Sequence, residues 1–417
     1  MSINPIVLSI PIYFALIGVE LLVERLQHTE RYRFHDAITN ISCGVTSQIT
    51  GVLLKVGVIG MYELLYTHFA LFRIPRTWAW GIVLFVLADL CYYFAHRYSH
   101  EISFFWGGHV VHHQSEDYNL SVALRQSSLQ GFFTFLFYLP LAILGFETEF
   151  FVYVSALVTL YQFWIHTEFI GKLGPLEWVL NTPSHHRVHH GRNPKYIDKN
   201  YAGTFIIWDR MFGTFQPEEE TPVYGITTPV RSWNPLWVNF SHYFQMREQL
   251  RETPGLGNKL RIVVGRPGWR PAALGGPHQI PEVSAGTLQK YTTSAPRTVN
   301  FYVLLQYVVL LGVAAVFMFT QKDMAPMLRY LVAGWCLWTA VACGALFEAK
   351  RTGYLLEPVR LVASLVLLLF ALRESSWFMP AAAAGSAWLL LSLLWAYSFR
   401  RVFASTASTT EASHAYA

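Results

Sequence analysis

Three short segments of the chain place histidines at spacings that suit metal binding. They hold His96 and His100; His109, His112 and His113; and His186, His189 and His190. On a helix, residues three or four positions apart share one face, so each segment can direct two or three ring nitrogens at one point. Neutral imidazole is a good ligand for iron, zinc, copper and nickel. The spacing therefore predicts that these segments bind metal.

The histidines are also concentrated in one part of the chain. Ten of the 16 lie between residues 96 and 190, where an even distribution would place about four. A lone histidine is more often a hydrogen-bonded core residue, but eight or more imidazoles exceed the needs of a single ion. Two metal ions that share a ring of histidines are the simplest interpretation. Iron suits such a shell when positions stay open for dioxygen.

Four further side chains near these segments are candidates. Asp89 falls within an apolar stretch, where a carboxylate is costly in lipid, so we expect it to orient a ligand imidazole or to join two helices. Glu101 directly follows the first segment and is a candidate for binding a cofactor, with a solvated helix end as the alternative. Glu116 and His185 are expected beside the ligands and not on the metal.

The composition indicates a membrane protein. The chain of 417 residues is 53% hydrophobic and only 14% charged, whereas soluble chains carry about a quarter charged residues. A bilayer needs about 20 apolar helical residues per span, and most of the apolar windows approach that length. We predict an all-α, multi-pass transmembrane helical bundle with about nine spans. The windows are 5–24, 41–66, 78–95, 129–146, 150–165, 300–319, 330–347, 354–372 and 379–399.

The charges predict which side of the membrane holds the histidines. A net charge of +5 is too dilute for a nucleic-acid-binding protein. When the chain is threaded through the spans, most Lys and Arg residues fall on one side, which the positive-inside rule makes cytosolic. The histidine segments lie on that same side. We therefore expect a cytosolic di-metal cap, in the endoplasmic reticulum of a eukaryote or the inner membrane of a bacterium.

Changes in composition along the chain predict five regions. Pro, Gly and charged residues are concentrated after the histidine segments, and the last residues are small and polar. The predicted regions are N-terminal membrane helices, 1–77; a catalytic domain with the histidine segments, 78–216; a cytosolic connector rich in Pro and Gly, 217–299; C-terminal membrane helices, 300–400; and a disordered tail, 401–417.

The runs of residues around the histidines resemble a known family. They are HRYSHE from His96, HVVHHQSEDYNLSVALRQS from His109, the run from Gln162 to Phe215, and GWRPAALGGPHQIPEV from Gly268. Together they are similar to the fatty acid hydroxylase and sterol desaturase superfamily of membrane di-iron oxygenases, and most closely to its ether-lipid-cleaving members. One departure is Ala202, which stands where the family pattern has glycine.

The resemblance implies a set of ligands, cofactors and a reaction. It assigns the eight histidines of the three segments to two iron ions and adds His166, which matches a further family histidine. It implies O2 as co-substrate, tetrahydrobiopterin as electron donor, and a pterin-recycling or redox partner. The implied substrate is a lipid taken from the bilayer. Hydroxylation of the carbon beside its ether oxygen would give a fatty aldehyde and a glycerol derivative.

Other functions remain as alternatives. A fatty acid or sterol C–H hydroxylase, or a desaturase, would use the same histidines with a different electron donor. A metal-binding or metal-transporting membrane protein would need ionisable residues along a path through the bilayer, whereas the candidates here gather at one face. A degenerate, structural family member would lack ligands, yet every segment is intact. The absence of HExxH and of Glu-x-x-His within 96–190 argues against a zinc metalloprotease and a soluble carboxylate-bridged di-iron bundle.

Overall fold

The chain is helical throughout the part that the structure describes. In the computed structural model, residues 5–284, 286 and 288–404 are described, and they form fifteen α-helices and five short 3-10 helices. Apart from two isolated bridges, Leu180 with Phe205 and Gly191 with Tyr224, no strand occurs within these ranges. The predicted all-α class is confirmed. Of the predicted tail, residues 405–417 lie outside the described residues.

The contacts divide the chain into two compact units, residues 1–230 with 238–290, and residues 231–237 with 291–417. The first unit holds every histidine segment. Its helices are α1 (Pro5–Gln27), α2 (Phe34–Phe69), α3 (Trp78–Glu101), α4 (Ser103–His113), α5 (Gln130–Thr134), α6 (Leu139–Leu144), α7 (Thr148–Tyr161), α8 (Pro183–His190), α9 (Ile207–Phe212) and α11 (Leu256–Val264), with most of α10 (Pro235–Glu252).

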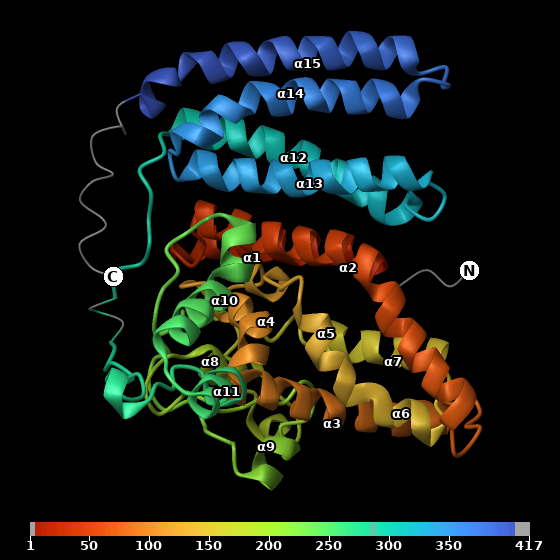
Figure 1. The fold of residues 1–417 in the computed structure, drawn as a ribbon, viewed down its shortest axis with the longest axis vertical. Coiled ribbons are helices and arrows are strands. Elements are labelled where there is room, and N and C mark those ends of the chain that lie inside the picture. Colours follow the sequence, from red (N-terminus) through yellow and green to blue (C-terminus); the bar gives the residue numbers. More distant parts are fainter. Residues whose placement is uncertain (1–4, 285, 287, 405–417) are drawn as a thin grey trace. The chain divides into compact units, whose positions relative to one another are not determined.

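The second unit consists mainly of four long apolar helices. They are α12 (Arg297–Thr320), α13 (Pro326–Phe347), α14 (Arg351–Leu372) and α15 (Phe378–Ser398), and Figure 1 shows them running alongside one another. Apolar residues lie on all their faces, as expected for helices surrounded by lipid. A buried ion pair between Glu357 and Arg360, with Tyr302 and Gln306 hydrogen-bonded to it, joins α14 to α12.

Among the described residues, five helices are long and apolar enough to cross a membrane, namely α3 and α12 to α15. A sixth span is α2, if its two parts, which meet at a bend of 51°, are counted together. These helices make the chain a membrane protein, but the predicted number of about nine spans is not confirmed.

Two of the predicted windows form helices that are too short to span a bilayer. Window 129–146 forms α5, a 3-10 turn and α6, and window 150–165 forms α7, which has only 14 residues. An α-helix rises about 1.5 Å per residue, so α7 reaches about 21 Å against about 30 Å of hydrocarbon. Window 5–24 lies in α1, which is not among the five. Its Glu20 accepts hydrogen bonds from the backbone of Leu120 and the hydroxyl of Thr167.

Candidate metal centre

Four segments of the first unit carry nine buried histidines. The last two turns of α3 supply His96 and His100, and the second half of α4 supplies the next three. His166 lies in the turn after α7, where its backbone N–H donates to Phe163. The short helix α8, which begins with Pro183 in the first turn, supplies the last three. The three segments whose spacing predicted a helix are helical, and His166 lies outside any helix. The nine histidines are His96, His100, His109, His112, His113, His166, His186, His189 and His190.

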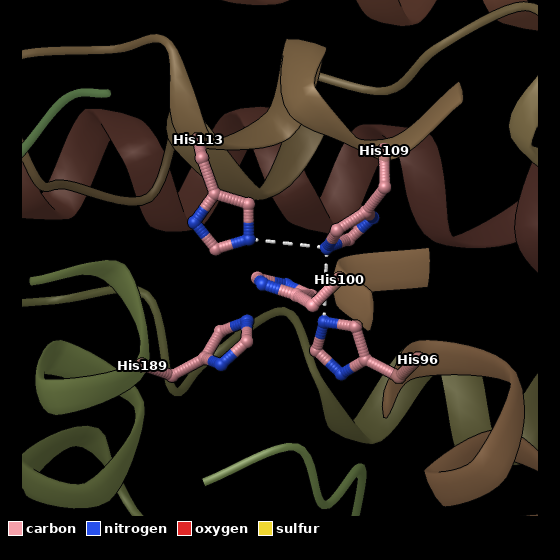
Figure 2. A group of neighbouring side chains, drawn as sticks. All are labelled: His96, His100, His109, His113 and His189. Atoms are coloured by element: carbon pink, nitrogen blue, oxygen red, sulfur yellow. Dashed lines mark hydrogen bonds between the residues drawn. The ribbon is translucent and has the colours of Figure 1, made fainter. Parts of the chain in front are cut away.

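These nine side chains gather in two groups. In each group the candidate ligand nitrogens all lie within 4.8 Å of one another. In the view of Figure 2, the other four rings of the first group lie around the ring of His100. The first group is His96, His100, His109, His113 and His189, and the second is His112, His166, His186 and His190. The groups adjoin because consecutive histidines divide between them: His112 and His113 belong to different groups, as do His189 and His190.

Backbone carbonyls fix the orientation of four of these rings. The Nδ1 atoms of His96 and His189 lie 2.7 and 2.9 Å from the carbonyls of Tyr201 and Lys199. Those of His112 and His166 lie 3.1 and 2.7 Å from the carbonyls of Arg125 and Gln162. Because a carbonyl only accepts, each Nδ1 carries the hydrogen, and each Nε2 is left with a lone pair for a metal.

The second group contains a contact that two neutral imidazoles alone do not explain. The Nε2 atoms of His112 and His166 lie 3.1 Å apart, and both lack a hydrogen because the Nδ1 atoms carry it. Two lone pairs at this distance repel unless a cation lies between them. Two nitrogens about 2.1 Å from one metal ion and at right angles to each other lie about 3.0 Å apart. The contact therefore fits a shared metal ion.

Other ring nitrogens also fit a metal. The Nε2 atoms of His100, His189 and His190 are buried and have no hydrogen-bond partner among the described residues. Burial and neighbouring imidazoles hold the pKa of His113 and His190 well below the usual value. Burial likewise lowers the pKa of His166 to about 3. These imidazoles are neutral at pH 7, which is the state that coordinates metal.

The loop after α8 supports the first group, and its anchors were not predicted. The buried carboxylate of Asp209 accepts hydrogen bonds of 2.8 Å from the backbone N–H groups of both Tyr201 and Ala202. Asn200 adopts φ +55° and donates from its side chain to the carbonyl of His185. These contacts hold the Tyr201 carbonyl against His96. Ala202 needs no left-handed backbone, so the alanine is accommodated without strain.

Asp89 supports the same loop from α3. Its carboxylate accepts hydrogen bonds from the backbone N–H groups of Thr204 and Phe205, at 2.7 and 3.0 Å, and from the indole of Trp208. Sequence reasoning expected a bond to a ligand imidazole or between two helices. The bond to Trp208 joins α3 to α9, and the two bonds to backbone N–H groups hold the loop whose carbonyls orient the ligand rings.

Gly203 offers a test of this arrangement. A Cβ atom there would lie 2.8 Å from Asp89 Oδ1 and 2.9 Å from the ring of Tyr92. We expect Gly203→Ala to lower the free energy of unfolding by about 1–3 kcal/mol through overpacking and to lower the metal content of the purified protein. Gly171→Ala is the matched control, because nothing lies within 4 Å of its Cβ. Equal thermal midpoints and metal contents for the two variants would contradict the prediction.

The remaining predicted residues lie outside both groups. Glu101 forms ion pairs with Arg97 and Arg266, at 3.1 and 3.7 Å. Glu116 is buried and lies 3.8 Å from Arg33. The ring of His185 packs edge-on against Phe215, and its Nδ1 has no hydrogen-bond partner among the described residues.

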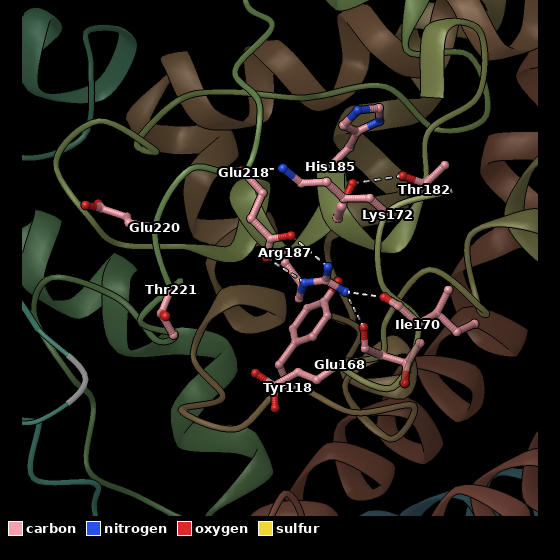
Figure 3. A network of polar contacts seen from close by, with 12 residues as sticks. Tyr118, Glu168, Ile170, Lys172, Thr182, His185, Arg187, Glu218, Glu220 and Thr221 are labelled. Carbon is pink, nitrogen blue, oxygen red and sulfur yellow. Dashed lines mark hydrogen bonds and ion pairs between the residues drawn. The ribbon is translucent and has the colours of Figure 1, made fainter. Parts of the chain in front are cut away.

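Arg187 ties α8 to the segment that carries His166 and forms an ion pair with Glu218. The guanidinium of Arg187 makes two 2.7 Å hydrogen bonds to the carboxylate of Glu218 and donates to the carbonyls of Thr167 and Ile170 (Figure 3). Sequence analysis had no role for this pair. Because Arg187 directly follows His186, its contacts fix α8 against the turn after α7 and so bring His186 to His166.

Tyr201 is a further residue that sequence reasoning missed. Its ring lies 5.3 Å from that of His100 and 5.9 Å from that of His96, measured between centroids. Its hydroxyl is buried and has no hydrogen-bond partner among the described residues. The available signal was its place directly before Ala202, within the run that resembles the family.

The comparisons with known proteins identify the class to which this fold and site belong. The fatty acid hydroxylase family model matches residues 81–214, the range that contains all nine histidines. The chain is thus an oxidoreductase of the fatty acid hydroxylase type, with a histidine site suited to two metal ions. No solved structure gives a significant match.

Curated relatives then narrow the class. The chain is 40% identical to alkylglycerol monooxygenase of Xenopus tropicalis over 85% of its own length and 80% of the relative's. It is 37% identical to the Danio rerio enzyme of the same name, over 92% and 86%, and 38% identical to that of Homo sapiens, over 86% and 81%. The chain belongs to the alkylglycerol monooxygenase family.

Proposed function

We propose that this protein is a membrane di-iron monooxygenase that cleaves the ether bond of alkylglycerol lipids. The observation that carries the proposal is the pair of adjoining groups of buried histidines within a chain of this family. The proposed ligands are the nine histidines of the two groups. Asp89, Asp209 and Arg187 support them without touching the metal.

The proposed reaction inserts one oxygen atom into the C–H bond of the carbon beside the ether oxygen. One atom of O2 becomes the new hydroxyl, and the other leaves as water after taking up two electrons and two protons. Tetrahydrobiopterin is the proposed electron donor. The hemiacetal product then loses its alcohol, the glycerol derivative, and becomes a fatty aldehyde. Iron, when bound, supplies the oxidising chemistry with O2.

The chain's own residues hold and shield the site. The carbonyls of Lys199 and Tyr201 keep the Nε2 atoms of His189 and His96 directed into the first group. The indole of Trp106 packs against the ring of His100, with 4.9 Å between centroids, and so covers one side of that group. A covered, apolar surrounding excludes water, which favours reaction with the positioned substrate.

The proposed site faces the cytosol at the membrane surface. His96 and His100 lie in the last two turns of α3, a candidate span that ends at Glu101. The alkyl chain of a substrate can therefore stay in the bilayer while its ether bond reaches the metal ions. We place the protein in the endoplasmic reticulum if its source is eukaryotic and in the inner membrane if it is bacterial.

The test is release of fatty aldehyde from 1-O-hexadecylglycerol by iron-loaded protein in detergent with O2. We expect aldehyde with tetrahydrobiopterin, little without pterin, and none from His189→Ala. Two bound irons without any aldehyde would overturn the substrate assignment. Aldehyde formed equally well without pterin but with a redox protein would overturn the choice of electron donor and leave ether cleavage standing.

A further inference from the structure

A hollow in the first unit combines an apolar floor with positive charge. It has a volume of about 430 Å³ and lies between α10, α11 and the start of α4. Its apolar lining comes from Phe104, Tyr243, Met246 and Leu250. Its charged lining is Arg247, Arg251 and Lys259, so no carboxylate lines it. This combination suits a ligand with an anionic head and an apolar tail.

The helix beside the hollow has an exposed apolar face. Leu256, Leu260 and Val264 are spaced four residues apart on α11, and their exposed fractions are 84%, 59% and 53%. Ile262, on the other face, is buried. A short amphipathic helix with leucines on one face and cations nearby is typical of a segment that lies in a membrane interface. The exposed row is therefore more consistent with contact to lipid than to water.

Hydrogen bonds place this helix at the end of a candidate membrane span. The backbone N–H of Ser103, two residues after the end of α3, donates to the carbonyl of Gly265 at 2.8 Å, directly after α11. The hydroxyl of Tyr243 on α10 donates to the carbonyl of Phe104 at 3.1 Å. Since α3 reaches the membrane surface at this point, both α11 and the hollow lie at the level of the lipid head groups.

Aromatic rings connect the span to the hollow. Phe104 packs against Phe133 and Tyr243, with centroids 5.2 and 5.7 Å apart, and Tyr98 on α3 stacks on Phe137. Tyr98 and Phe104 are exposed. Tyrosine and tryptophan side chains gather at the membrane–water interface, because one part of each side chain is apolar and another part is polar. Tyr98 and Tyr243 thus support the same depth for the hollow as the hydrogen bonds do.

The three cations that line the hollow are positioned to bind an anion. Arg251 and Arg247 share one carboxylate on their own helix, that of Glu248, at 3.1 and 3.7 Å. Lys259 faces the same hollow from α11. Exposed ion pairs are weak and exchange readily with other anions, so a lipid phosphate can compete for these cations.

We propose that the hollow binds the phosphate head group of an anionic membrane phospholipid, with the acyl chains lying along the exposed face of α11. The site is separate from the two histidine groups, and the proposal does not depend on the ether-cleaving activity. Each basic residue at a membrane surface strengthens binding to anionic lipid by about fivefold. Loss of all three cations should therefore weaken it by about 100-fold.

The test uses the purified full-length protein in detergent, titrated with phosphatidylglycerol or phosphatidylcholine and followed by native mass spectrometry. We expect tight binding of one phosphatidylglycerol by the wild type, and binding about 100-fold weaker by the variant R247Q/R251Q/K259Q. The matched control K195Q/K322Q/R373Q removes three exposed cations elsewhere and should bind as the wild type does. Metal content and thermal midpoint check that each variant is folded.

Two results of the titration would overturn the proposal. One is equal affinity of the wild type for the two lipids, and the other is a loss of binding as large in the control as in the hollow variant. A second measurement uses a nitroxide spin label attached to L260C of the protein in lipid nanodiscs, and compares how often the label collides with two relaxation agents. We expect it to collide more with O2, which dissolves in lipid, than with a water-soluble nickel complex. The reverse order would place α11 in water and contradict the proposal.

Discussion

Replacing His186 with alanine is expected to remove about one of the two metal ions and to lower aldehyde formation by more than 100-fold. His186 belongs to the second group, and its Nε2 lies 3.0 Å from that of His166. Loss of a residue that only supports a ligand already costs about 10–100-fold in metal affinity or activity, so loss of a ligand costs more. Iron analysis of the purified protein and single-turnover kinetics measure both effects.

The neighbouring histidine provides the matched control. His185 is also buried on α8, but it belongs to neither group and packs against Phe215. His185→Ala should therefore keep two metal ions and most of the activity, with only a modest loss of stability. If His185→Ala loses metal as His186→Ala does, or if His186→Ala keeps both ions, the division of the histidines into two groups is wrong.

Breaking the ion pair between Arg187 and Glu218 is expected to destabilise the protein by about 3–5 kcal/mol. Both side chains are largely buried, since the exposed fraction is 8% for Arg187 and 16% for Glu218. The change Arg187→Met leaves a buried carboxylate without its cation and two carbonyls without a donor. Because Arg187 holds α8 against the turn that carries His166 through these two carbonyls, the metal of the second group should be lost first. Thermal unfolding in detergent and iron analysis test these expectations.

A second variant separates the ion pair from the packing. In Arg187→Met/Glu218→Leu no charge is left unpaired, so the double variant should recover part of the lost stability, although the carbonyls of Thr167 and Ile170 still lack their donor. Replacement of a whole buried pair by apolar residues is often nearly neutral. A double variant that is less stable than Arg187→Met alone would show that the pair acts in some other way.

Much of the site could be predicted because its signals are local. Histidines at offsets of three and four residues lie on one helical face whatever surrounds the helix. The division of adjacent histidines between two groups could not be predicted. His112 and His113 point about 100° apart around α4, and the group that each joins depends on where α8 and the turn after α7 are packed. That packing rests on contacts between residues far apart in the chain, such as Arg187 with Glu218.

The supporting contacts were missed for a related reason. The groups that orient His96 and His189 are main-chain carbonyls, which every residue carries and no sequence pattern marks. The carboxylates of Asp89 and Asp209 hold those carbonyls in place through backbone N–H groups. Among the membrane helices, hydropathy located α3 and α12 to α15, but it did not separate them from apolar segments that are too short to span. Pro140, near the start of α6, was the available sign of a break in window 129–146.

The origin of the oxygen in the released aldehyde tests the central claim most directly. Iron-loaded protein would be given 1-O-hexadecylglycerol and a pterin donor under ¹⁸O2, and the aldehyde reduced at once to hexadecanol, because aldehyde oxygen exchanges with water. The account predicts ¹⁸O in the hexadecanol and none in the glycerol, since the new hydroxyl becomes the aldehyde oxygen. Unlabelled hexadecanol, formed equally well without O2, would contradict oxygenation and show that water cleaves the ether.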